Sequence, residues 1–128
     1  MLVDAADAGD RDRLDDYVEA HVHGPVRLDR DVEALVLDPC YRGTDVDVRA
    51  RALPCPVEWH PGFRLAVDEL VRHPSYRGPE IVELGVAVAR DGLLDARVVG
   101  DAVRAGRADP QSLKKVWHCV ARFGERGR

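Results

Sequence analysis

Three side chains that can do chemistry recur at alternate positions near the start of the chain: Glu19, His21 and His23. A β-strand directs alternate residues to one face. The spacing therefore predicts a strand over residues 17–23, with these three groups on one face and apolar residues on the other. A carboxylate held on a rigid strand is suited to catalysis, so Glu19 is the candidate catalytic residue. The alternative is a structural ion pair between Glu19 and Arg27 or Arg64.

The two histidines are also a metal candidate. Two imidazoles that share one face of a strand can bind one divalent ion, and His60 could supply a third ligand. No carboxylate stands at a spacing that completes a known zinc motif. We therefore expect no metal site. A small metal-dependent hydrolase that uses His21, His23 and His60 is kept as an alternative function, and a non-catalytic interaction module as another.

A nine-residue pattern occurs twice, as LVLDPCYRG at 35–43 and LVRHPSYRG at 70–78. One interpretation is two similar turns, since proline fixes φ, glycine permits a positive φ and tyrosine can pack over the bend. The other is functional, because Arg42 and Arg77 hold equivalent positions and could clamp a phosphate. His60 lies in the run WHPGF at 59–63, where an aromatic ring, an imidazole and a Pro-Gly turn could form the wall of a substrate pocket.

The elements expected around these residues indicate an α+β fold, with a small sheet of short N-terminal strands followed by three C-terminal helices. Further strands are expected over 31–38 and 57–60, and a helix over 45–53 that Thr44 and Asp47 would cap. The three helices begin at Pro79, Asp95 and Pro110, and Trp117 is expected to be buried as the anchor of the last one. Residues 1–16 are an N-terminal extension, 17–124 a single domain and 125–128 a disordered tail.

Composition excludes several classes of protein. The net charge of −4 argues against non-specific binding to nucleic acid, which needs a basic surface. No apolar run approaches the ~18 residues of a membrane span, and residues 1–16 lack the basic and apolar regions of a secretory signal. The three cysteines form no CxxC motif and predict free thiols in a reducing cytoplasm.

The chain resembles the C-terminal part of a bacterial family known as domain of unknown function 3626. The resemblance runs in order from about residue 15 to 124. Its motifs are YVEAHVHGPV at 17–26, DVEALVLDP at 31–39, EWHPGFR at 58–64, YRGPE at 76–80, LKKVWH at 113–118 and RFG at 122–124. Position 21 departs from the family pattern, where glutamine is the more frequent residue.

The layout of that family resembles the NAD-dependent ADP-ribosyltransferases, which use an arginine, a Ser/Thr strand and a glutamate strand. The resemblance places Glu19 on the glutamate strand, where it would stabilise the oxocarbenium-like centre of the nicotinamide ribose. The other two motifs would lie upstream. The resemblance therefore implies that this chain is the C-terminal fragment of an ADP-ribosyltransferase-like domain. NAD would be the cofactor of the completed domain, the chain alone would be inactive and bind no cofactor, and its partners would be the missing N-terminal half or a protein target.

Overall fold

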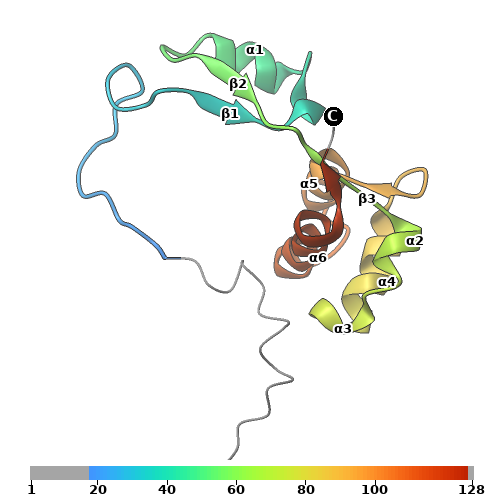
Figure 1. The fold of residues 1–128 in the computed structure, drawn as a ribbon. Helices are drawn as coiled ribbons and strands as arrows, with labels where there is room; N and C mark the ends of the chain where they lie inside the picture. Colours follow the sequence, from blue (N-terminus) through green and yellow to red (C-terminus); the bar gives the residue numbers. More distant parts are fainter. Residues whose placement is uncertain (1–17, 127–128) are drawn as a thin grey trace, which may run out of the picture.

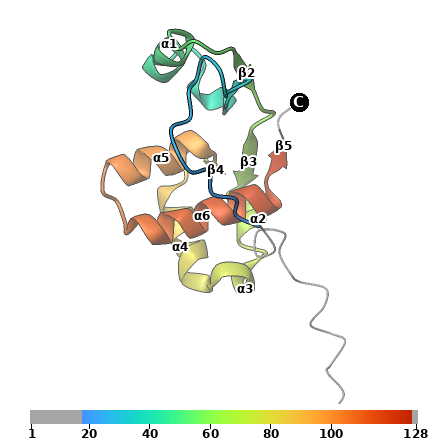
Figure 2. The same ribbon diagram turned by 90° about the vertical axis from the view of Figure 1, so that its left-hand side faces the viewer.

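The structure, a computed structural model, describes residues 18–126 and consists of helices and two small sheets (Figures 1 and 2). The mixture of strands and helices expected from the sequence is confirmed. The order of the elements matches the prediction only in part, because short strands also lie between and after the helices. None of the helices in the described part of the chain combines the length and apolarity that a membrane crossing requires.

The first sheet belongs to a β-α-β unit. Strand β1 (Leu35–Leu37) is followed by the 3₁₀ helix η1 (Pro39–Tyr41) and by α1 (Asp45–Arg51), and the chain returns as β2 (Val57–Trp59). The two strands are parallel, and Leu37 pairs with Trp59. A parallel pair requires a crossover, which α1 provides. Because parallel strands end at the same edge of a sheet, the residues that follow β1 and β2 become neighbours.

The second sheet and the longer helices form the rest of the described chain. Strand β3 (Phe63–Ala66) lies between β4 (Leu93–Leu94) and β5 (Glu125–Arg126), and both pairings are antiparallel. The helices, in chain order, are α2 (Val67–Leu70), α3 (Pro74–Arg77), α4 (Pro79–Val88), α5 (Ala96–Arg104) and α6 (Pro110–Phe123). Figure 1 shows this helical part below the β-α-β unit, with β3 leading from one to the other.

The main core lies between β3, β4 and the helices α4, α5 and α6. Leu65, Leu94, Leu113, Val116 and Val120 are at most 1% exposed. On α6 these apolar positions recur at i, i+3 and i+7, so one stripe of the helix faces the core. Each of the three predicted C-terminal helices is present, and Pro79 and Pro110 stand at the first positions of α4 and α6 as expected.

The predicted strand over residues 17–23 is wrong for residues 18–23, which have no regular secondary structure; Tyr17 lies outside the described residues. All of these side chains are exposed, and Val18 and Val22 are 95% and 76% exposed. Figure 1 shows the segment arching away from the remaining elements. A strand forms only when its backbone groups pair with a neighbour, and the described chain offers none along this segment.

Several other boundaries also differ. The strand expected over 31–38 is limited to β1 (Leu35–Leu37). The expected tail is partly ordered, because Glu125 and Arg126 pair with Arg64 and Phe63 in β3. Trp117 is only half-buried at the edge of the core, where its ring meets that of Phe63 edge-on with centroids 6.4 Å apart.

Helix α1 begins where predicted but is capped differently. Thr44 is the N-cap residue, yet its hydroxyl donates to the Tyr41 carbonyl and makes no cap bond. Asp47 instead accepts a hydrogen bond from the Gly43 amide, 2.9 Å away, and pairs with Arg51. These contacts lower the pKa of Asp47, chiefly through the Gly43 amide.

Candidate functional site

Two of the sequence motifs meet at one cavity between the β-α-β unit and the helical part. Asp38 directly follows β1 and His60 directly follows β2, so the parallel pairing brings them together. A cavity of about 440 Å³ lies beside them. Its lining comes from the turn after β1, the turn before β3 and the start of α5: Asp38, Pro39, Cys40, Arg42, Pro61, Gly62, Phe63, Arg64 and Asp95.

The imidazole of His60 is held at both nitrogens. The Gly62 amide donates to Nδ1 across 2.9 Å, and Nε2 lies 3.3 Å from Oδ2 of Asp38. Because an amide can only donate, Nδ1 must accept, and neutral His60 carries its proton on Nε2. The Nε2–Oδ2 contact is within ion-pair reach but is too poorly aligned to count as a hydrogen bond, and Oδ2 is otherwise buried without a partner. His60 therefore orders the turn and does not line the cavity.

The turn that His60 orders is tightly packed. Gly62 has a φ of +79°, and a Cβ at this position would lie 2.8 Å from Cγ of Pro39. A side chain is therefore excluded both by the backbone conformation and by the contact with η1. The Asp38-Pro39 and Pro61-Gly62 turns fit against each other, which fixes one wall of the cavity.

Cys40 lies in the same wall but is not a nucleophile at neutral pH. Burial raises the pKa of the Cys40 thiol to about 12, and hydrogen bonding to Asp38 and the negative charges of Asp38 and Asp95 contribute to the rise. Only the thiolate attacks, so a thiol of this pKa is almost wholly unreactive. Since His60 faces Asp38 rather than Cys40, a Cys–His nucleophile–base pair is not formed here.

The structure separates the two arginines that the repeated pattern suggested as a phosphate clamp. Arg42 lines the cavity and its Cζ lies 4.7 Å from the centroid of the Trp59 ring. Arg77 ends α3, where its Cζ lies 4.6 Å from the Tyr76 ring, and it does not line this cavity. Both copies of the pattern are helical turns that begin with proline and reach a glycine of positive φ, Gly43 and Gly78. The interpretation as two similar turns accounts for the pattern.

The other arginine at the cavity is Arg64, which sequence reasoning considered only as a partner for Glu19. It is exposed on β3 and stands opposite Glu125 in the ladder. No local pattern links Arg42 to Arg64, since they become neighbours of one cavity only after β1, β2 and β3 are in place. Asp38, Cys40 and Asp95 were missed for the same reason.

Glu19, His21 and His23 lie on the exposed segment and not at this cavity. Nε2 of His21 is 3.4 Å from Oε2 of Glu19, and both side chains are well exposed. This contact between residues i and i+2 places the two side chains on one side of an extended chain, as the period-two spacing predicted.

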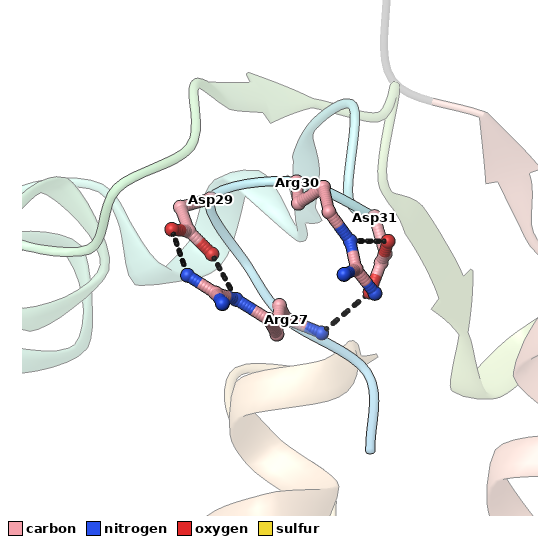
Figure 3. A network of polar contacts seen from close by, with 4 residues as sticks. All are labelled: Arg27, Asp29, Arg30 and Asp31. Carbon is pink, nitrogen blue, oxygen red and sulfur yellow. Dashed lines mark hydrogen bonds and ion pairs between the residues drawn. The ribbon is translucent and has the colours of Figure 1, made fainter. Parts of the chain in front are cut away.

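The exposed segment is joined to β1 by an ordered turn (Figure 3). The Arg27 guanidinium binds both carboxylate oxygens of Asp29, while Arg30 binds both oxygens of Asp31. The Arg27 amide also donates to Asp31 across 2.9 Å. These contacts lower the pKa of both carboxyl groups, through Arg27 for Asp29 and chiefly through Arg30 for Asp31. Arg27 is thus engaged within the turn and makes no ion pair with Glu19.

Residues 18–126 hold no group of three His, Cys, Asp or Glu side chains placed to bind one metal ion. His21, His23 and His60 all lie in this range. The alternative of a metal-dependent hydrolase built on these three histidines therefore has no geometric support.

The fold and the cavity define a small protein of helices and two short sheets, with an Asp-His junction between a β-α-β unit and a helical part. The model of the family "Protein of unknown function (DUF3626)" matches residues 1–123, and the chain belongs to this family. No curated protein and no solved structure matches the chain.

Proposed function

We propose that this chain contributes the glutamate strand of an ADP-ribosyltransferase-like site, with Glu19 as its catalytic carboxylate. The observation that supports the proposal is the state of the segment around Glu19. It has the period-two pattern of a strand, yet it pairs with no strand among residues 18–126, and its apolar residues Val18 and Val22 are 95% and 76% exposed. A segment with this pattern and an exposed apolar face is suited to adding to a sheet as a new strand.

In the completed sheet Glu19 would point to the same side as His21, as their 3.4 Å contact already suggests. The carboxylate would stabilise the positive charge that develops on the nicotinamide ribose when the bond to nicotinamide breaks. His21 would orient that carboxylate through its hydrogen bond. NAD is the cofactor that this proposal requires, on the resemblance of the family to ADP-ribosyltransferases.

The arginine and Ser/Thr motifs of such a site are not among the 128 residues, so the proposal places them in further polypeptide that pairs with Val18–His23. The 128-residue chain alone would then be inactive.

Cys40, Cys55 and Cys119 are free thiols in the structure. Free thiols are typical of a reducing compartment, and we propose that the protein is cytoplasmic.

Release of nicotinamide from NAD tests the proposal. The purified 128-residue chain is expected to show no turnover above its Glu19→Gln variant. A longer family protein that carries the arginine and Ser/Thr motifs ahead of the same segment is expected to release nicotinamide. Its equivalent of Glu19→Gln should lose at least ~100-fold, the scale of removing one electrostatic catalytic group. Glu33→Gln, at another exposed carboxylate, is the matched control and should have no effect. Unchanged turnover in the Glu19 variant of the longer protein would refute the assignment.

A further inference from the structure

The cavity beside Asp38 and Arg64 carries positively charged side chains, a property that is independent of Glu19. Two arginines, Arg42 and Arg64, line it, and neither makes an ion pair with a carboxylate anywhere in residues 18–126. Elsewhere in the described chain arginines such as Arg27, Arg51 and Arg104 are paired with aspartates. Two unpaired guanidinium groups on one concavity form a site for an anion.

The Arg42 side chain is held by stacking, which leaves its hydrogen-bond donors available. Its Cζ lies 4.7 Å from the centre of the Trp59 ring. A guanidinium over a ring face keeps its N–H groups in the plane, pointing outward. Asp47 is near enough for the charge of Arg42 to contribute to the lowered pKa of Asp47, but its oxygens are bonded to Gly43 and Arg51.

Neither carboxylate of the cavity forms an ion pair with Arg42 or Arg64. Asp38 is 11% exposed, with Oδ1 bonded to the Cys40 amide and Oδ2 turned towards His60. Asp95 caps α5 by accepting from the Val98 amide across 2.8 Å. Both carboxylates are therefore committed to the fold, while Arg42 and Arg64 are exposed.

The size and walls of the cavity indicate what carries the anion. At about 440 Å³ it is larger than a free phosphate needs and falls within the range of small-molecule sites. Phe63 provides an apolar wall, and the guanidinium of Arg126, on the adjacent strand β5, lies 5.8 Å from its ring. A phosphate between the arginines would leave room for an organic group against Phe63.

We propose that the cavity lined by Arg42 and Arg64 binds the phosphate group of a small phosphorylated molecule. Arg42 and Arg64 each donate hydrogen bonds to the phosphate oxygens. The Asp38–His60 pair and the Pro61-Gly62 turn are positioning groups that fix one wall of the cavity. The site uses only described residues, and it stands whether or not Glu19 acts on NAD.

Isothermal titration calorimetry on the 128-residue chain tests this proposal with three probes: inorganic phosphate, ribose 5-phosphate and AMP. Saturable binding of at least one probe is expected, and Arg42→Ala and Arg64→Ala should each weaken it by roughly tenfold, the value of a charge-assisted hydrogen bond. Arg64→Lys should bind with an intermediate affinity, because it keeps the charge but loses the planar fork. The order of the three affinities identifies whether the phosphate, the sugar or the base is recognised.

Arg49→Ala is the matched control. Arg49 is also exposed and makes no ion pair in the described chain, but it lies on α1 at a different cavity. It should bind each probe within about twofold of the unchanged chain, since surface changes away from a site have small effects. The proposal is overturned if none of the probes saturates, or if Arg49→Ala weakens binding as much as Arg42→Ala and Arg64→Ala do. Circular dichroism of each variant checks that the fold is retained.

Discussion

At the scale of single residues, the junction after β1 and β2 depends on a histidine in one tautomer. The Gly62 amide fixes Nδ1 of His60 as an acceptor, so Nε2–H faces the Asp38 carboxylate. Asp38 in turn binds the Cys40 amide, and burial together with the Asp38 carboxylate raises the pKa of the Cys40 thiol. The polar contacts of these residues are therefore made within the protein. Arg42 and Arg64, in contrast, are exposed and available to bind a ligand.

The raised pKa of the Cys40 thiol predicts how its alkylation rate changes with pH and with substitution of Asp38. Its raised pKa means that at pH 8 roughly one thiol in ten thousand is ionised, and alkylation should accelerate as the pH rises towards 12. Asp38→Asn removes a negative charge beside the sulfur, lowers the pKa of Cys40 and should increase its alkylation rate at pH 8. Burial, the largest cause of the shift, remains, so the rate should stay below that of an exposed cysteine.

Mass spectrometry after iodoacetamide treatment would measure this rate for each cysteine. Cys119, buried on α6, is the internal control and should react equally slowly in both proteins if the fold is intact. An unchanged Cys40 rate beside an unchanged Cys119 rate would show that Asp38 does not set the reactivity of Cys40.

Sequence reasoning at the residue scale named His60 and Arg42 but not the other residues of the cavity. The interpretation that paired Arg77 with Arg42 rested on the Pro-x-Tyr pattern that both follow, and local similarity carries no information on distance. Arg64 and Asp38 belong to the site only because β1 and β2 pair in parallel. A long-range parallel pairing leaves no periodic signal between the two segments.

At the scale of elements, the longer helices were predictable and the shortest elements were not. Helices α4, α5 and α6 carry a proline or a capping aspartate at their start and an apolar stripe along one side. Helices α2 and α3 have four residues each, and β4 and β5 have two. Elements this short are determined by tertiary contacts rather than by their own pattern.

The packing of α4 against its neighbours predicts that alanine is less favourable than glycine at position 85, the opposite of their order in helix propensity. A Cβ added at Gly85 would lie 2.5 Å from Leu70 and 3.7 Å from Val116 on α6. Gly85→Ala should therefore destabilise the protein by about 1–3 kcal/mol through overpacking, although alanine is normally the better helix residue. Urea unfolding would measure this change in the free energy of unfolding.

Gly100 on α5 is the matched control. A Cβ there would meet only the Arg104 guanidinium and the Tyr41 hydroxyl, at 3.4 Å or more. Gly100→Ala should be neutral or stabilise by up to about 1 kcal/mol. If both alanine variants stabilise the protein, the close approach of α4 to Leu70 and Val116 is incorrect.

At the scale of the whole molecule, the two parts of the structure differ in how fully their apolar residues are buried. The helical part encloses a core of fully buried leucines and valines. The β-α-β unit has only two strands of three residues, and Val36 and Val48 are 58% and 68% exposed. Parallel sheets are usually covered on both faces, so this unit exposes more apolar surface than is usual for a parallel sheet.

The segment around Glu19 shows the limit of prediction from sequence most clearly. The period-two pattern is present, and the Glu19–His21 contact agrees with it, but the strand is absent from residues 18–23. The sequence records which side chains share a face. Whether a strand forms depends on a partner strand, and this is a property of the assembled molecule.

Hydrogen exchange at the backbone amides of residues 18–24 tests the central claim, that this segment becomes a strand only in the complete catalytic sheet. In the 128-residue chain these amides should exchange at the rate of an unstructured peptide, because none of them donates a hydrogen bond to another of residues 18–126. In a longer family protein that releases nicotinamide from NAD, the same amides should be protected by at least ~100-fold. Strong protection in the 128-residue chain, or none in the active longer protein, would contradict the account.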